Sequence, residues 1–156
     1  MPITQANLWL PFDRETEHLI YVITTNSVIR SDQLVMGAGA ARQARERYPE
    51  LAADCASRIR QLATPDYGCL LVRAPDARSH RPGLALFQVK RDYRAPAELD
   101  LIARSVRDLS DMAVVRSTEQ FRLNLPGIGL HTGRLPRSLV EPLLSVLPDN
   151  VIVCYL

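Results

Sequence analysis

Residues 20–41 read IYVITTNSVIRSDQLVMGAGAA, and this stretch indicates the fold class. Residues 20–26 form an apolar, largely β-branched run that ends in polar side chains, which predicts a buried strand. About ten residues later, Gly37 and Gly39 lead into a segment with helical patterning. Glycines let the main chain approach a ligand, and the first turn of a helix presents unpaired N–H groups. The stretch therefore predicts a strand, a phosphate-binding loop and a helix, in that order.

The rest of the chain alternates between strand-like and helical patterns. Strands are expected at Ile3–Trp9, His18–Thr24, Cys69–Arg73, Leu84–Val89, Phe121–Leu125 and Val151–Tyr155. Helices are expected at Ala38–Tyr48, Leu51–Leu62, Ala97–Met112 and Arg137–Leu147. Alternation without a break in composition predicts a single α/β domain over residues 1–156, with helices on both faces of a mixed sheet.

Composition narrows the class of protein. The chain has 156 residues, 47% of them apolar, and no apolar run of about 18 residues that could span a membrane. The N-terminus lacks the pattern of a signal peptide, and the three cysteines are widely spaced, so we expect a cytoplasmic protein with no metal site. A net charge of +2 is too small to indicate a nucleic-acid partner by itself.

One feature of the composition excludes a large class of nucleotide-binding proteins. All but one of the 19 basic residues are arginine, and the single lysine, Lys90, lies in the sequence Val-Lys-Arg. A Walker A loop requires Gly-Lys-Ser or Gly-Lys-Thr, so the chain is not a P-loop ATPase or GTPase. A Rossmann dinucleotide site is disfavoured too, because Arg42 occupies the third small position of GxGxxG.

A second glycine-containing loop follows the fifth predicted strand. Residues 125–136 read LPGIGLHTGRLP and lead into the last predicted helix. In an α/β sheet, the loops at the carboxyl ends of the strands line one crevice, where ligands usually bind. Two such loops converging there suit a diphosphate, with one phosphate held by each loop.

Three segments, in this order, resemble the macro domain, a family that binds ADP-ribose: TTNSVIRSDQLVMGAGAARQARERYP, FQVKRDYRAPAELDLIARSVRDL and LPGIGLHTGRLPRSLVEPLL. The likeness is greatest to the branch of terminal ADP-ribose glycohydrolases and of antitoxins that remove ADP-ribose from DNA. The resemblance implies a three-layer α/β/α fold with a mixed central sheet of about six strands. It also implies that the partner is ADP-ribose or an ADP-ribosylated macromolecule. A nucleic acid would bind only as an ADP-ribosylated substrate, and no cofactor is expected.

The resemblance also assigns site residues. Lys90 matches the catalytic lysine of this branch, and Asn26 matches the asparagine that approaches the distal ribose. The expected ligand-binding residues are Asn7, Asn26, Met36, Gly37, Ala38, Gly39, Ala40, Gly127, Ile128, Gly129, Leu130, His131, Thr132 and Gly133. An unprotonated lysine can attack the anomeric carbon, expel the bound carboxylate or base, and form a Schiff-base-type intermediate.

The sequence departs from the family pattern in ways that leave alternatives open. Gly133 stands where the glycohydrolases carry an assisting aspartate, and Asn7 stands where an aspartate usually binds adenine. Ala38 interrupts the glycine run of the first loop. Removal of ADP-ribose from a DNA base or a protein through Lys90 is the first hypothesis. A non-catalytic ADP-ribose-binding module and an ADP-ribose-1''-phosphate phosphatase are the alternatives.

Overall fold

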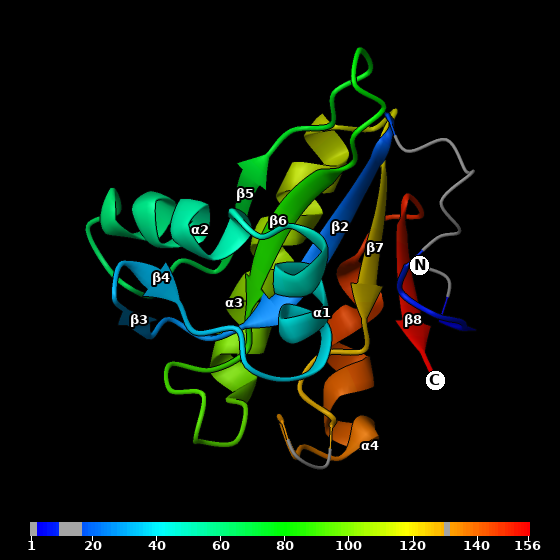
Figure 1. Ribbon diagram of the computed structural model, residues 1–156. Helices are drawn as coiled ribbons and strands as arrows, with labels where there is room; N and C mark the ends of the chain where they lie inside the picture. Colours follow the sequence, from blue (N-terminus) through cyan, green and yellow to red (C-terminus); the bar gives the residue numbers. More distant parts are fainter. Residues whose placement is uncertain (1–2, 10–16, 130–131) are drawn as a thin grey trace.

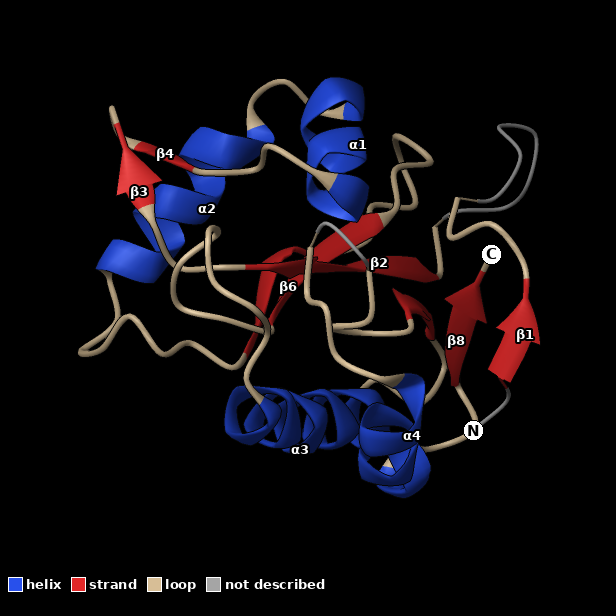
Figure 2. Cartoon of the chain, turned by 90° about the horizontal axis from the view of Figure 1, so that it is seen from below, coloured by secondary structure: helices blue, strands red, loops and turns tan. Residues whose placement is uncertain are grey.

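A six-stranded sheet lies between two layers of helices (Figures 1 and 2). The computed structural model describes residues 3–9, 17–129 and 132–156. The strands are β1 (Ile3–Gln5), β2 (Leu19–Thr25), β3 (Ile29–Arg30), β4 (Gln33–Leu34), β5 (Cys69–Arg73), β6 (Gly83–Gln88), β7 (Gln120–Asn124) and β8 (Val151–Tyr155). The helices are α1 (Gly39–Arg47), α2 (Leu51–Arg60), α3 (Leu99–Val115), α4 (Arg137–Val140) and the 3₁₀ helix η1 (Glu141–Val146).

The strand order in the large sheet is β1-β8-β7-β2-β6-β5. β5 is antiparallel to β6, and every other neighbouring pair is parallel. β2 lies in the middle and pairs with β6 on one side and β7 on the other. Burial on both faces explains why β2 reads LIYVITT, a nearly continuous apolar run. The predicted mixed sheet of about six strands, flanked by helices, is confirmed.

Each face of the sheet has its own apolar core. Figure 2 shows α1 and α2 on one face and α3 with α4 on the other. On the α3 side, the helix buries a stripe that includes Ile102, Val106 and Leu109 against strand residues such as Phe121. On the other side, Ala44 of α1 packs in the core that contains Ile23 of β2. None of the described helices has the length and apolar character needed to cross a membrane.

Several boundaries differ from the predicted ones for local reasons. β1 ends at Gln5 rather than Trp9, because the Asn7 side-chain oxygen accepts the Trp9 N–H at 3.0 Å and bends the chain. The last predicted helix changes to 3₁₀ form at Glu141, where Pro142 has no N–H to donate. Residues 29–34 form a small antiparallel hairpin that the sequence pattern did not indicate.

Candidate functional site

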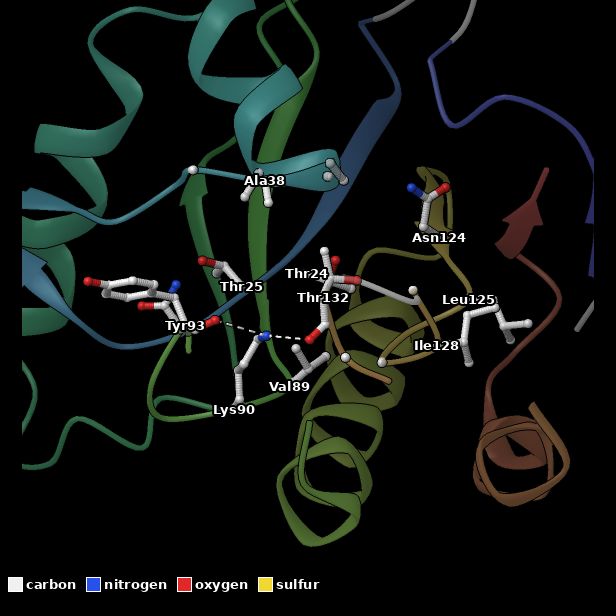
Figure 3. Close-up of a pocket in the computed structure, with 18 of the residues that line it drawn as sticks. Thr24, Thr25, Ala38, Val89, Lys90, Tyr93, Asn124, Leu125, Ile128 and Thr132 are labelled. Atoms are coloured by element: carbon white, nitrogen blue, oxygen red, sulfur yellow. Dashed lines mark hydrogen bonds between the residues drawn. The ribbon is translucent and has the colours of Figure 1, made fainter. Parts of the chain in front are cut away.

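A cavity of about 520 Å³ opens at the carboxyl ends of the parallel strands (Figure 3). Residues following or ending β2, β6, β7 and β8 contribute to its wall, because these parallel strands end at the same edge of the sheet. Its lining consists of Thr24, Thr25, Asn26, Val35, Gly37, Ala38, Gly39, Ala40, Ala41, Val89, Lys90, Tyr93, Asn124, Leu125, Gly127, Ile128, Gly129, Thr132, Gly133, Cys154, Tyr155 and Leu156. None of these described lining residues is an aspartate or a glutamate.

The first glycine loop places a helix N-terminus in the cavity wall. Residues 37–41 line the cavity, and α1 begins at Gly39. The N-cap residue, Ala38, makes no side-chain capping bond, and the first turn of the helix has no acidic residue. The N–H groups and the positive end of the helix dipole are therefore available to an anion in the cavity.

The second glycine loop folds back on itself across from the first. Gly127 adopts a φ of +78°, and its carbonyl oxygen accepts the Leu135 N–H at 2.8 Å. Gly129 accepts N–H bonds from Thr132 at 3.2 Å and from Arg134 at 2.8 Å. A Cβ built on Gly39 of the first loop would lie 3.6 Å from Thr132 Cγ2, so the two loops approach each other at the cavity. The structure thus brings both glycine loops to one site.

Gly133 has a packing reason to be glycine. A Cβ at this position would lie 2.2 Å from the carbonyl oxygen of Gly127. Any side chain here, including the aspartate that the glycohydrolases carry, would require the loop backbone to move.

Lys90 lies at one end of the cavity, just beyond β6, and is 7% exposed. Its Nζ donates to three main-chain oxygens, those of Thr132 at 2.8 Å, Ala95 at 3.0 Å and Tyr93 at 3.4 Å. Figure 3 marks the bonds to Thr132 and Tyr93. Three acceptors match the three protons of an ammonium group, and none of these acceptors is a carboxylate. The amine is therefore held at a fixed position between the segment that follows β6, which contains Tyr93 and Ala95, and the second glycine loop, which contains Thr132.

The surroundings of Lys90 shift the pKa of its amine downward. Burial lowers the pKa of Lys90 below its usual value, and the positive charge of Arg134 lowers this pKa further. Asp92 acts in the opposite direction and raises the Lys90 pKa. The lowering effects are those that an amine nucleophile needs near neutral pH.

Asn26 follows β2 and holds the start of the next loop. Its Oδ1 accepts the Val28 N–H at 2.7 Å, and its Nδ2 donates to the Val35 oxygen at 2.9 Å. Its own carbonyl oxygen accepts the Tyr67 hydroxyl at 2.7 Å. One Nδ2 proton beyond the Val35 bond is left for a ligand, and Asn26 lines the cavity at the Lys90 side.

Most of the residues expected at the site lie around this cavity. These are Asn26, Gly37, Ala38, Gly39, Ala40, Lys90, Gly127, Ile128, Gly129, Thr132 and Gly133. Met36 is instead 1% exposed in the core beneath α1 and α2, and Asn7 is an exposed residue outside the cavity lining. Leu130 and His131 lie outside the described residues.

Other lining residues were not assigned from the sequence. They include Thr24, Thr25, Tyr93, Asn124, Leu125, Cys154, Tyr155 and Leu156. A signal for Thr24, Thr25 and Asn124 was available in the sequence, because they are polar residues at the ends of apolar strands. In α/β sheets, ligands bind at the carboxyl ends of the strands. No cluster of three or more His, Cys, Asp or Glu side chains suited to a metal ion occurs in the described part of the chain.

Comparison with known proteins relates the fold to solved structures. No family model matches the sequence, and no curated protein matches it. The macrodomain of Thermus aquaticus DarG aligns with a TM-score of 0.70 at 21% identity, covering 98% of this chain and 95% of that one. The macrodomain of Mycobacterium tuberculosis DarG aligns with a TM-score of 0.69 at 24% identity, covering 97% and 96%.

A further structure with this fold contains a ligand. Thermosipho africanus DarTG in complex with ADP-ribose aligns with a TM-score of 0.66 at 20% identity, covering 88% of this chain and 38% of that one. These alignments show that the chain has the fold of macrodomains.

Proposed function

We propose that the cavity binds ADP-ribose and that Lys90 acts there to release ADP-ribose from a macromolecule, a DNA base or a protein. The observation that carries the proposal is the position of Lys90. A buried lysine with a lowered pKa lies beside two glycine loops in one cavity, with no acidic side chain among the described lining residues. The solved structures that share the fold of this chain include one in complex with ADP-ribose.

The cavity has the size and polarity for such a ligand. A volume of about 520 Å³ lies within the range of small-molecule sites. The N-terminus of α1 and the facing second loop would hold the diphosphate between them. Asn26 and Lys90 would then lie at the distal ribose, whose anomeric carbon carries the macromolecule.

The proposed reaction uses the neutral amine of Lys90. Nζ attacks the anomeric carbon as the bond from that carbon to the base or carboxylate breaks, and the leaving group takes the bonding electrons and one proton from Nζ. The ribose ring then opens, its ring oxygen takes the second Nζ proton, and a Schiff base forms between Nζ and the former anomeric carbon. One water molecule hydrolyses the Schiff base, which returns the free amine and ADP-ribose, whose ring closes again. The carbonyl oxygens of Thr132 and Ala95 position Nζ for the attack.

A second function is favoured by two features of the same site. The three carbonyl acceptors around Nζ also suit a protonated lysine, and Gly133 provides no general acid or base. These features favour a non-catalytic module that binds ADP-ribose.

The test combines calorimetry with turnover assays. Wild type, Lys90→Ala and Lys90→Arg are titrated with ADP-ribose and then incubated with an ADP-ribosylated oligonucleotide and an ADP-ribosylated protein. We expect all three proteins to bind, and only the wild type to release ADP-ribose, because arginine keeps the charge but is not a nucleophile. Equal release by Lys90→Ala would exclude the lysine mechanism, and binding without release by the wild type would establish the binding module.

A further inference from the structure

The two ends of the cavity differ in chemistry. The end near β6 carries Lys90, Thr25 and Asn26. The opposite end is formed by β7 and β8 and is mainly apolar, with contributions from Leu125, Ile128, Cys154, Tyr155 and Leu156. β6 and β8 are separated by β2 and β7 in the sheet, so the two ends lie roughly 14 Å apart, or three strand spacings. An elongated ligand with one polar and one flat apolar end fits this arrangement.

Asn124 brings an amide into the apolar end. It is the last residue of β7 and pairs in register with Cys154 of β8. Figure 3 shows its side chain on the far side of the cavity from Lys90 and Tyr93. Asn124 is half-buried, and its amide makes no hydrogen bond within the described residues, whereas the Asn26 amide is tied to Val28 and Val35.

Asn7, the residue expected to contact adenine, makes hydrogen bonds to Trp9 and Arg122 instead. Its Oδ1 accepts the Trp9 N–H at 3.0 Å, and its carbonyl oxygen accepts a bond from the buried Arg122 guanidinium at 2.7 Å. Arg122 also donates to the Leu8 oxygen at 2.8 Å, so both neighbouring peptide groups are held. Asn7 is exposed and does not line the cavity.

We infer that Asn124 is the residue that reads the base of the bound nucleotide. The inference rests on the proposed function and assigns the base specificity of that site. An asparagine amide offers one acceptor and one donor side by side, which matches the 6-amino group and N7 of adenine. Hypoxanthine presents two acceptors, O6 and N7, along the same edge, so it would lose one of the two bonds. Apolar neighbours such as Leu125 and Tyr155 would cover the faces of the ring.

The experiment compares two ligands that differ only in the base, ADP-ribose and inosine diphosphate ribose. Their affinities are measured by calorimetry for the wild type, Asn124→Leu and Asn124→Asp. We expect the wild type to prefer ADP-ribose about tenfold, since a bidentate contact discriminates bases by about that factor. Asn124→Leu, of similar size, should bind ADP-ribose about tenfold more weakly and show no preference. Asn124→Asp should keep the preference, because a carboxylate still accepts from the amino group and cannot donate to O6.

The outcomes separate this inference from the proposed function. If the wild type binds ADP-ribose and Asn124→Leu keeps both its affinity and its preference, the base is read by another residue and the inference is wrong. If the wild type binds neither ligand, the proposed function fails and the inference fails with it. Thermal unfolding of each variant verifies folding. If Asn124→Leu unfolds, loss of the preference in Asn124→Asp would overturn the inference, because the carboxylate still accepts from the amino group of adenine.

Discussion

Lys90 Nζ donates a hydrogen bond of 2.8 Å to the main-chain oxygen of Thr132, a residue 42 positions further along the chain. The bond joins the end of β6 to the second glycine loop and holds the amine where both loops meet the cavity. A single side chain therefore ties the loop in place and carries the proposed chemistry. This dual role makes the protonation state of Lys90 the first quantity to test.

Replacing Arg134 should change the pH dependence of turnover. The proposed reaction needs neutral Lys90, so its rate should rise as pH increases through the Lys90 pKa. Arg134 lowers that pKa, and Arg134→Gln removes the positive charge, so the pKa rises and the rising limb of kcat/KM moves to higher pH. Arg78→Gln is the matched control, because Arg78 lies in the loop between β5 and β6, at the opposite end of β6 from Lys90. An unshifted profile in Arg134→Gln would show that Lys90 ionisation does not limit the rate.

A methyl group at Gly133 should destabilise the second loop, whereas one at Gly37 should not. The added Cβ would meet the Gly127 oxygen at 2.2 Å in the first case and no atom within 4 Å in the second. We expect Gly133→Ala to lose about 1–3 kcal/mol of unfolding free energy, the usual cost of overpacking. Gly37→Ala should remain near wild type in stability. Chemical denaturation measures both, and equal stability of the two variants would mean that the loop adjusts freely.

Arg122→Met should lower the free energy of unfolding more than the same substitution of an exposed arginine. The Arg122 guanidinium is buried and donates to the oxygens of Asn7 and Leu8, which the variant leaves without these donors. The expected loss is about 2–4 kcal/mol of unfolding free energy. Arg107→Met, at an exposed position of α3, should stay within about 0.5 kcal/mol of wild type. A loss of similar size in both variants would contradict a specific role for the bonds to Asn7 and Leu8.

Tyr67→Phe should lower the free energy of unfolding, because it removes a hydrogen bond to the main chain of Asn26. The Tyr67 hydroxyl donates to the Asn26 oxygen at 2.7 Å, and burial raises the Tyr67 pKa well above its usual value, so the donor persists across neutral and mildly alkaline pH. Removing it should cost about 1–2 kcal/mol of unfolding free energy. Urea denaturation of the variant gives this value. Stability equal to that of the wild type would mean that the Asn26 oxygen finds another donor.

Local patterns were sufficient for the elements with long apolar runs. The predicted bounds Cys69–Arg73 and Val151–Tyr155 are those of β5 and β8, and the predicted helix Ala97–Met112 corresponds to α3, Leu99–Val115. The hairpin at residues 29–34 escaped prediction because two-residue strands leave too short a pattern. It turns at Ser31 and Asp32, which adopt positive φ without a glycine to signal the turn.

The order of residues alone determined the class of fold and the two glycine loops, because periodicity and helix-start signals are local properties. Lys90 became a candidate through the resemblance of the surrounding segments to the macro domain. The contacts of these residues depended on the packing of distant segments. The three oxygens around Nζ, the separation of Asn7 from the cavity and the amide of Asn124 at its apolar end all follow from β2 lying between β6 and β7, with β8 alongside β7. Strand order arises from pairings between residues far apart in the chain, and no local pattern encodes such pairings.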